Sequence, residues 1–341
     1  MLEKVLTWYS GLSDGLFGSI VLFIVGALLL IKGGDWFVDA SVGIAKRFRV
    51  PEIVIGATVV SVGTTLPEVM VSLTAALNAN SAIAYGNAIG SIICNTALIA
   101  ALTVAIRPAP VNRKSLAAPV AFFFLSAAVY SLAAYVFGSF DRWLGIVMLI
   151  IFGAYMALTL RNGLKSSQSS EEMGASFSGG SIVKDVVLIV ISAALIALGA
   201  DMLEASSVSL ATMAGIPTEV VGVTVVALCT SLPELVTAIT ALAKGHGALS
   251  LGNIIGANIF NLVLVTGASA TISPFAVPEG SKLFGMNTSQ IFEIPLVIAS
   301  MAILTLPALV RGRLRRWQGI TLLAVYAAFV ILQVLIALKV L

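Results

Sequence analysis

The sequence has little charge and few of the side chains that bind transition metals or act as nucleophiles. Lysine, arginine, aspartate and glutamate make up 10% of its 341 residues, against 59% hydrophobic residues, and it has two cysteines and one histidine. So little polar surface cannot coat a soluble globule. With His246 as its only histidine, the chain lacks a Ser/His pair and a histidine-rich metal cluster. We therefore expect no enzyme, an intramembrane hydrolase included.

Long apolar runs take up most of the remaining sequence. Ten of them approach the roughly 20 residues that cross a bilayer as a helix. The first is kept as a span because it is long and lacks a small-residue cleavage site after a short core. The sequence therefore predicts an all-α polytopic membrane protein whose partner is the lipid bilayer, with no nucleic-acid partner. We place the spans near 17–45, 53–77, 82–105, 115–137, 141–160, 184–211, 218–243, 248–271, 289–310 and 317–340.

The basic residues are distributed unevenly around these spans. With the N-terminus outside, 14 of the 19 lysines and arginines fall in inward loops and four on the outward side, and Lys32 lies within the first span. Cytoplasmic loops carry such an excess, so we expect both termini to lie outside. Residues 162–183 are rich in serine and glycine and predict a cytoplasmic linker, and 273–288 predict an outer loop.

The two halves of the chain repeat each other at a fixed offset of 166 residues. Between about 51–98 and 217–264, roughly twenty of some fifty positions are identical, including prolines, glycines, asparagines and a glutamate that apolar bias does not explain. Each half, 1–161 and 184–341, contains five spans, so the second copy must enter the membrane from the opposite side. The sequence predicts two inverted five-helix repeats with broken helices at the membrane midplane.

Each repeat carries a proline and a glutamate within an apolar run, Pro67-Glu68 and Pro233-Glu234. A charged acid at the bilayer centre costs roughly 2.5–3.5 kcal/mol on insertion scales, and no basic residue in the apolar cores can pair with these two. Proline has no N–H, so the carbonyl four residues earlier loses its helical partner. Freed carbonyls at this depth are good ligands for hard cations. The expected site contains both glutamates, the carbonyls of Ser61, Thr64, Ala227 and Thr230, and the hydroxyls of Thr64, Thr65, Thr230 and Ser231.

A second repeated block, 86–95 and 252–261, differs in kind. Its glycines stand four residues apart in both copies and should let helices approach closely. Ser91 and Asn95 share one helix face. We add both to the expected ligands together with Asn261, with helix–helix hydrogen bonding as the alternative role of the two asparagines.

Carboxylates, carbonyls, hydroxyls and amides make an all-oxygen ligand set, which suits Ca²⁺ or Na⁺ rather than zinc or copper. Two ionised glutamates balance one Ca²⁺, and several Na⁺ ions or protons restore the balance instead. A shared site that holds either one divalent ion or several monovalent ions is the physical basis of antiport. Like charges held together favour protonation of one carboxyl when the site is empty, so proton competition is also expected.

The remaining acidic, histidine and cysteine side chains are expected to have simpler roles. Asp35 and Asp201 align at the repeat offset, and we favour a structural or gating role for both. We expect solvated helix ends at Asp39 and Glu204, a loop at His246, and buried structural thiols at Cys94 and Cys229.

On these blocks the sequence resembles the cation/Ca²⁺ exchanger superfamily, and specifically its prokaryotic sodium/calcium exchangers. The likeness covers nearly the whole chain through ten spans, two alpha repeats, and motifs of the form Gly-Thr-Ser-Leu-Pro-Glu and Gly-Asn-x-x-Gly-Ser-Asn-x-x-Asn. It implies exchange of three Na⁺ for one Ca²⁺ in a prokaryotic inner membrane, without a cofactor, while the first and sixth helices slide across an eight-helix core. It implies Ca²⁺ ligation by Glu68, Glu234 and the carbonyls of Thr64 and Thr230, and Na⁺ contacts from the carbonyls of Ser61 and Ala227 and from Thr65, Ser91 and Ser231.

The sequence departs from the family pattern at four of these positions. Thr65 stands for serine and keeps the hydroxyl, and Cys229 stands for glycine. Ala257 replaces a serine, which puts one Na⁺ site and the stoichiometry in question. Asn261 replaces the aspartate of some members and argues against K⁺ dependence. The leading interpretation is a Na⁺/Ca²⁺ antiporter that works as a monomer by alternating access, with an H⁺/Ca²⁺ antiporter and a passive cation channel as alternatives.

Overall fold

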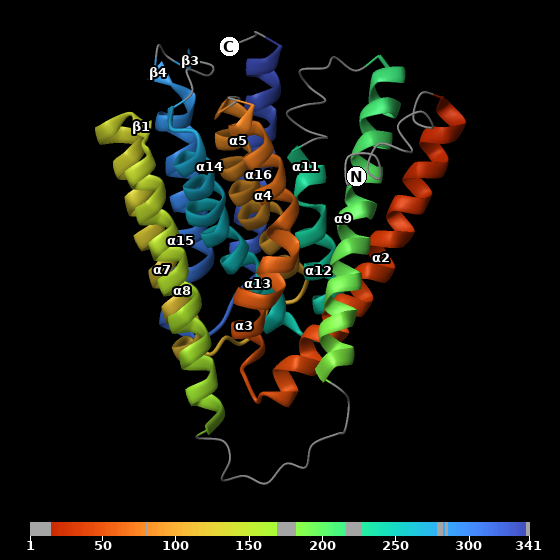
Figure 1. Ribbon diagram of the computed structural model, residues 1–341, viewed down its shortest axis with the longest axis vertical. Helices are drawn as coiled ribbons and strands as arrows, with labels where there is room; N and C mark the ends of the chain where they lie inside the picture. Colours follow the sequence, from red (N-terminus) through yellow and green to blue (C-terminus); the bar gives the residue numbers. More distant parts are fainter. Residues whose placement is uncertain are drawn as a thin grey trace.

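The computed structural model describes residues 15–78, 81–168, 182–215, 227–277, 282–283 and 286–338, and they are almost entirely helical (Figure 1). Among these residues, nine helices are long and apolar enough to cross a membrane. The chain is thus an all-α integral membrane protein, as predicted. The nine spans are Leu16–Arg47, Glu52–Leu77, Ile83–Ile106, Arg113–Phe137, Arg142–Gly163, Ile182–Met213, Gly247–Ile272, Ser289–Arg311 and Arg316–Ile336.

The tenth predicted span, 218–243, is described only from residue 227 onward. It contains a short helix α11 (Ala227–Thr230), a turn at Ser231, and α12 (Leu232–Ala243). Its earlier part, with the aligned Pro217 and Gly222, lies outside the described residues. The predicted linker 162–183 is likewise described only in part, because α8 (Arg142–Gln168) continues seven residues into it and residues 169–181 are not described.

Two helices of 32 residues each, α2 (Leu16–Arg47) and α9 (Ile182–Met213), pack lengthwise against each other at one side of the molecule (Figure 1). A Cβ atom on Gly26 would lie 2.8 Å from the carbonyl oxygen of Gly199, and a Cβ on Gly33 would lie 3.1 Å from that of Ser192. At the repeat offset, Gly26 aligns with Ser192 and Gly33 with Gly199, so the repeat relation exchanges these two contacts. This exchange is what an inverted repeat would produce.

Helix α13 (Gly247–Phe260) occupies the centre of the helix assembly and is buried along almost its whole length. It packs against the continuous helix formed by α3 (Glu52–Ile55), the π-helical segment η2 (Gly56–Val60) and α4 (Ser61–Leu77). A Cβ on Gly252 would run into the carbonyl oxygen of Ile53. The close approach predicted from glycine spacing is therefore confirmed in this block.

The first copy of the glycine block, residues 86–95, shows no such close approach to another described helix. No described atom outside the glycine's own helical turn lies within 4 Å of a Cβ built on Gly86 or Gly90. At the repeat offset, the partners of these glycines would fall at about 219–223, outside the described residues.

The other spans surround this centre, and several contain a π-helical segment (η). They are α5 (Ser81–Ile93), η3 (Cys94–Ala100) and α6 (Ala101–Ile106); α7 (Arg113–Leu132) and η4 (Ala133–Phe137); η7 (Ser289–Glu293) and α15 (Ile294–Arg311); and α16 (Arg316–Ala337). The span of α13 itself continues through η6 (Asn261–Val265) and α14 (Thr266–Ile272). The end of the molecule where α2 finishes and α9 begins is called the lower end, as it appears in Figure 1.

Short antiparallel strand pairs lie at the upper end. Strand β1 (Ser139–Phe140) pairs with β2 (Phe275–Ala276), and β3 (Lys282–Leu283) pairs with β4 (Met286–Asn287). The segment predicted as an outer loop, 273–288, is therefore partly β-structured.

Candidate cation site

One glutamate from each half of the chain reaches the interior of the helix assembly. Glu68 lies in α4, one residue after Pro67, and Glu234 lies in the first turn of α12, one residue after Pro233. Both side chains are 0% exposed, and their carboxyl groups lie close enough to interact directly. None of the salt bridges among the described residues involves either acid. The structure therefore brings the two acids together without a basic partner.

The two prolines have different effects on their helices. Helix α4 continues through Pro67, and the distortion before it is the π-helical segment η2. In the second half the helix is interrupted, because Ser231 adopts a turn conformation (φ −95°, ψ 9°) between α11 and α12. Ala227 and Thr230, whose carbonyl oxygens are expected to bind the ion, are the first and last residues of α11.

Hydroxyl groups of α4 connect it to the second half of the chain. Thr65 Oγ1 donates to Glu234 Oε1 at 3.4 Å. Thr64 Oγ1 donates to Asn253 Oδ1 at 3.2 Å, and Ser61 Oγ donates to the backbone oxygen of Asn253 at 2.9 Å. The hydroxyls of Ser61 and Thr64 are thus used in contacts with α13, which leaves their backbone carbonyls as the groups that could face an ion.

Buried polar atoms without a hydrogen-bond partner are concentrated among the expected ligands. Burying such an atom costs about 1–3 kcal/mol, and nearly all buried polar groups in proteins are paired. Nine of the 16 unpaired atoms in the described part of the chain belong to six expected ligands. They are both oxygens of Glu68, Oε2 of Glu234, the hydroxyls of Ser91 and Ser231, and the whole amide groups of Asn95 and Asn261. This donor set, rich in oxygen and holding two carboxylates, fits a hard cation.

Both asparagines lie at the start of a π-helical segment. Asn95 is the second residue of η3, and Asn261 is the first residue of η6, so the widened turns fall at matching places in the two repeats. At the end of η6 the hydroxyl of Thr266, the first residue of α14, donates to the Asn261 carbonyl at 3.0 Å. Single π-helical turns are frequent at functional sites.

Two further asparagines support the glutamates and were not expected in this role. Asn253 Nδ2 donates to Thr237 Oγ1 at 3.1 Å, and that hydroxyl donates to the carbonyl of Glu234 at 3.0 Å. Asn87 Nδ2 donates to the carbonyl of Glu68 at 3.2 Å. The signal was present in the sequence, because both asparagines follow the first glycine of their repeated block.

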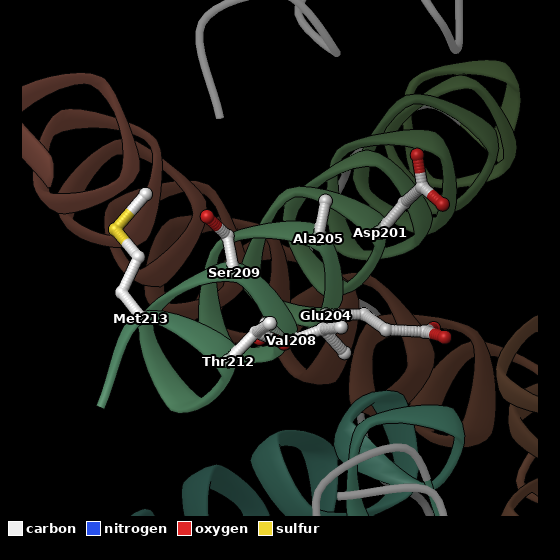
Figure 2. Close-up of a pocket in the computed structure, with 7 residues that line it drawn as sticks. All are labelled: Asp201, Glu204, Ala205, Val208, Ser209, Thr212 and Met213. Atoms are coloured by element: carbon white, nitrogen blue, oxygen red, sulfur yellow. The ribbon is translucent and has the colours of Figure 1, made fainter. Parts of the chain in front are cut away.

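The acids of α2 and α9 lie inside their helices, so the prediction of helix ends at Asp39 and Glu204 is wrong. Lys244 Nζ lies 2.6 Å from Asp35 Oδ1 and 2.7 Å from Asp39 Oδ1 at the lower end. Asp201 and Glu204 line a cavity of about 620 Å³ in the upper half of α9 (Figure 2). The helices are longer than the roughly 20 residues needed to cross a bilayer, which allows them to carry charged turns near both faces.

His246 lies at a helix start beside an acid, and the two cysteines are buried. His246 is the N-cap residue of α13, and its Nδ1 lies 2.9 Å from Glu52 Oε1. Cys94 and Cys229 are buried free thiols, as predicted.

Comparisons with known proteins agree on the family of this chain. The model of a family described as sodium/calcium exchanger protein matches residues 18–161 and 184–335. The chain is 31% identical over 349 residues to the sodium/calcium exchanger MaX1 of Methanosarcina acetivorans, covering 92% of this chain and 97% of that protein. It is 33% identical over 307 residues to the uncharacterized membrane protein MJ0091 of Methanocaldococcus jannaschii, covering 89% and 94%.

A solved structure gives the same match in three dimensions. The chain superimposes on the sodium-calcium exchanger NCX_Mj with a TM-score of 0.76 at 30% sequence identity, over 92% of this chain and 98% of that one.

Proposed function

The chain belongs to the sodium/calcium exchanger protein family, and we propose that it is a secondary active antiporter that exchanges Na⁺ for Ca²⁺ at one shared site. The observation that carries this proposal is the set of unpaired buried oxygens around Glu68 and Glu234. The names of MaX1 and NCX_Mj support the choice of ions.

In this proposal Ca²⁺ is the substrate of the two glutamates. Their carboxylates, with the carbonyls of Thr64 and Thr230, supply oxygen ligands and two negative charges for one divalent ion. Leaving both carboxylates ionised and close together without a cation is costly in a low-dielectric interior. Na⁺ ions take the place of Ca²⁺ at the same acids, with further contacts from the carbonyls of Ser61 and Ala227 and from the side chains of Thr65, Ser91, Asn95, Ser231 and Asn261.

Alternating access would use the α2–α9 pair as the moving part. The two helices pack closely at Gly26 and Gly199, and Arg47 Nη2 of α2 lies 3.2 Å from Asp185 Oδ2 of α9. These contacts favour movement of the pair as one unit across the other helices. The two inverted repeats, 1–161 and 184–341, would expose the site to either side of the membrane in turn.

The proposed topology places the lower end in the cytoplasm and both termini outside, in a prokaryotic inner membrane, because the lower end carries most of the basic residues. One chain supplies every proposed ligand, so the monomer is the proposed working unit.

Counter-ion-resolved flux tests the proposal. Purified protein is reconstituted into vesicles, and ⁴⁵Ca²⁺ uptake is measured under an imposed Na⁺ gradient, an imposed pH gradient, or no gradient. Uptake that follows the Na⁺ gradient is the expected result. Uptake that follows the pH gradient and ignores Na⁺ would identify an H⁺/Ca²⁺ antiporter, and passive uptake without a counter-ion would identify a channel.

A further inference from the structure

Two short loops at the lower end are joined through their backbones. Residues 107–112 connect α6 to α7, and residues 312–315 connect α15 to α16. The N–H of Val111 donates to the carbonyl of Gly312 at 2.9 Å, and the N–H of Leu314 donates to that of Ala109 at 2.9 Å. Pro110 and Arg313 form an antiparallel bridge between these bonds. The ends of four spans are thereby held together in one unit, which we call the basic loop pair.

The basic loop pair and the adjoining helix turns carry seven positive charges and no acidic residue. All seven side chains are exposed, and none of them takes part in a salt bridge among the described residues. They are Arg107, Arg113, Lys114, Arg311, Arg313, Arg315 and Arg316. Two other cations at the same end are neutralised: Arg47 pairs with Asp185, and Lys244 pairs with Asp35 and Asp39.

The position of these charges is fixed by the spans that they terminate. The four apolar helices end or begin at Ile106, Arg113, Arg311 and Arg316, so the charges lie where hydrocarbon gives way to lipid headgroups. Trp317 follows directly and is 45% exposed, as is common for tryptophan at a membrane interface. The general excess of basic residues in cytoplasmic loops explains their sign. It does not explain why seven gather on one backbone-joined pair of loops without any acid.

We propose that the basic loop pair binds the phosphate groups of anionic phospholipids in the adjoining leaflet. Clusters of roughly four to eight lysines and arginines next to a span attract anionic headgroups. The guanidinium group of arginine can also donate two parallel hydrogen bonds to a phosphate. Because the loop pair joins α6 and α7 to α15 and α16, a bound lipid stabilises the lower ends of all four helices. This inference depends on the chain spanning a membrane and not on the identity of the transported ions.

Thermal unfolding of the full chain in detergent tests the inference. The protein is titrated with mixed micelles of phosphatidylglycerol, with phosphatidylcholine micelles, and with inorganic phosphate. The test variant combines Lys114→Gln, Arg313→Gln and Arg316→Gln. The matched control combines Lys46→Gln, Arg161→Gln and Lys184→Gln, which removes three exposed cations from the same end of the molecule, none of them in a salt bridge among the described residues.

Phosphatidylglycerol should raise the melting temperature of the wild type and of the control, and phosphatidylcholine and inorganic phosphate should not. In the test variant the half-saturating phosphatidylglycerol concentration should rise about tenfold or more, with a weaker effect at high salt. Equal responses of the two triple variants would overturn the inference, and so would an equal effect of inorganic phosphate. If the triple variant does not fold, Arg313→Gln alone should raise the half-saturating phosphatidylglycerol concentration about fivefold. An unchanged concentration would also overturn the inference.

Discussion

The ammonium group of Lys244 lies 2.6 Å from Asp35 Oδ1 and ties the lower end of α12 to the lower half of α2. The same nitrogen donates to the Asp35 carbonyl at 3.0 Å and lies 2.7 Å from Asp39 Oδ1. Partial burial opposes the charge, but the hydrogen bonds and charges of Asp35 and Asp39 outweigh it and raise the pKa of Lys244 above its ordinary value. At the repeat offset Asp35 aligns with Asp201, whereas Lys244 aligns with Asn78. An ionic contact of this kind therefore has no charged counterpart at the upper end.

Lys244→Gln should loosen α2 at the lower end. Partly exposed ion pairs are worth about 0.2–1 kcal/mol each, so loss of both pairs should lower the population of the present arrangement about two- to thirtyfold against its alternatives. Hydrogen–deuterium exchange of the α2 amides around residues 33–40 should rise accordingly. Lys184→Gln is the control, because Lys184 is exposed at the same end and forms no salt bridge with any described residue. Equal exchange in the two variants would contradict the prediction.

The effect of Lys244→Gln has a defined pH dependence. A lysine with a raised pKa contributes stability that is complete below its unfolded value and is lost as pH rises through the folded value. The difference in exchange between wild type and Lys244→Gln should therefore stay constant from pH 7 to 9 and shrink only above about pH 10.5. A difference that disappears near neutral pH would show that another titrating group governs this contact.

Replacing either buried acid by its amide should reduce Ca²⁺ exchange without destabilising the fold. Glu68→Gln and Glu234→Gln keep the side-chain shape but remove one charge from a fully buried pair. Loss of a buried ionic ligand costs at least about 3 kcal/mol, so Ca²⁺ exchange should fall about 100-fold or more. The melting temperature without Ca²⁺ should not fall, because the repulsion between the carboxylates is relieved.

Glu293→Gln provides the control for these variants, because Glu293 lies in a span but bonds to Gln333 Nε2 at 2.9 Å. It should retain Ca²⁺ exchange and Ca²⁺-dependent thermal stabilisation. Normal exchange in Glu68→Gln or Glu234→Gln would refute the assignment of the site.

Asn253 should matter more than its repeat counterpart Asn87. Asn253 connects Thr64 of α4 with Thr237 of α12, so Asn253→Ala leaves two buried hydroxyls short of a partner. Among the described residues, the Asn87 amide nitrogen donates to α4, to the Glu68 carbonyl and to Ser72 Oγ. We expect Asn253→Ala to lower the unfolding free energy by about 1–3 kcal/mol and to raise the Ca²⁺ KM, with a smaller KM change in Asn87→Ala. Equal changes in KM would show that the connection between α4 and α12 does not position the acids.

Much of the fold was predictable because membrane-length apolar runs and a fixed repeat offset are local or periodic signals. Nine predicted spans are confirmed within a few residues, and the offset correctly indicated that Glu68 and Glu234 would lie together. The offset works because a fold built from two like halves places equivalent residues at equivalent depths.

The details of the site needed the structure. The hydrogen bond between Thr64 and Asn253 joins residues 189 positions apart, and the pairing of Lys244 with Asp35 joins residues 209 positions apart. No periodic pattern indicates such contacts. The π-helical turns at Asn95 and Asn261 were also missed, because an added residue in a turn changes the packing register and leaves composition and hydropathy unchanged.

Adding a methyl group at the α13 glycines should disrupt the helix assembly. In Gly252→Ala the new Cβ meets the Ile53 carbonyl, and in Gly256→Ala it lies 2.7 Å from the Ala57 carbonyl. Backbone cannot move aside without parting α13 from α3 and η2, so the melting temperature should fall sharply in both. Gly153→Ala, in α8 with open space around its Cβ position, should be neutral or stabilising by up to about 1 kcal/mol. A tolerated Gly252→Ala would show that this packing is softer than the structure indicates.

Ala257 is fully buried in α13, at the position where the resembling family carries a serine hydroxyl. Ala257→Ser restores one neutral oxygen ligand, four residues before Asn261. A neutral oxygen adds little to the binding of Ca²⁺ by two carboxylates, whereas a monovalent ion depends more on such ligands. Ca²⁺ flux titrated against Na⁺ should therefore show a larger change in Na⁺ affinity than in Ca²⁺ affinity. Ala238→Ser, at a fully buried alanine of α12, controls for a buried hydroxyl as such, and equal shifts of both affinities in Ala257→Ser would remove position 257 from the Na⁺ site.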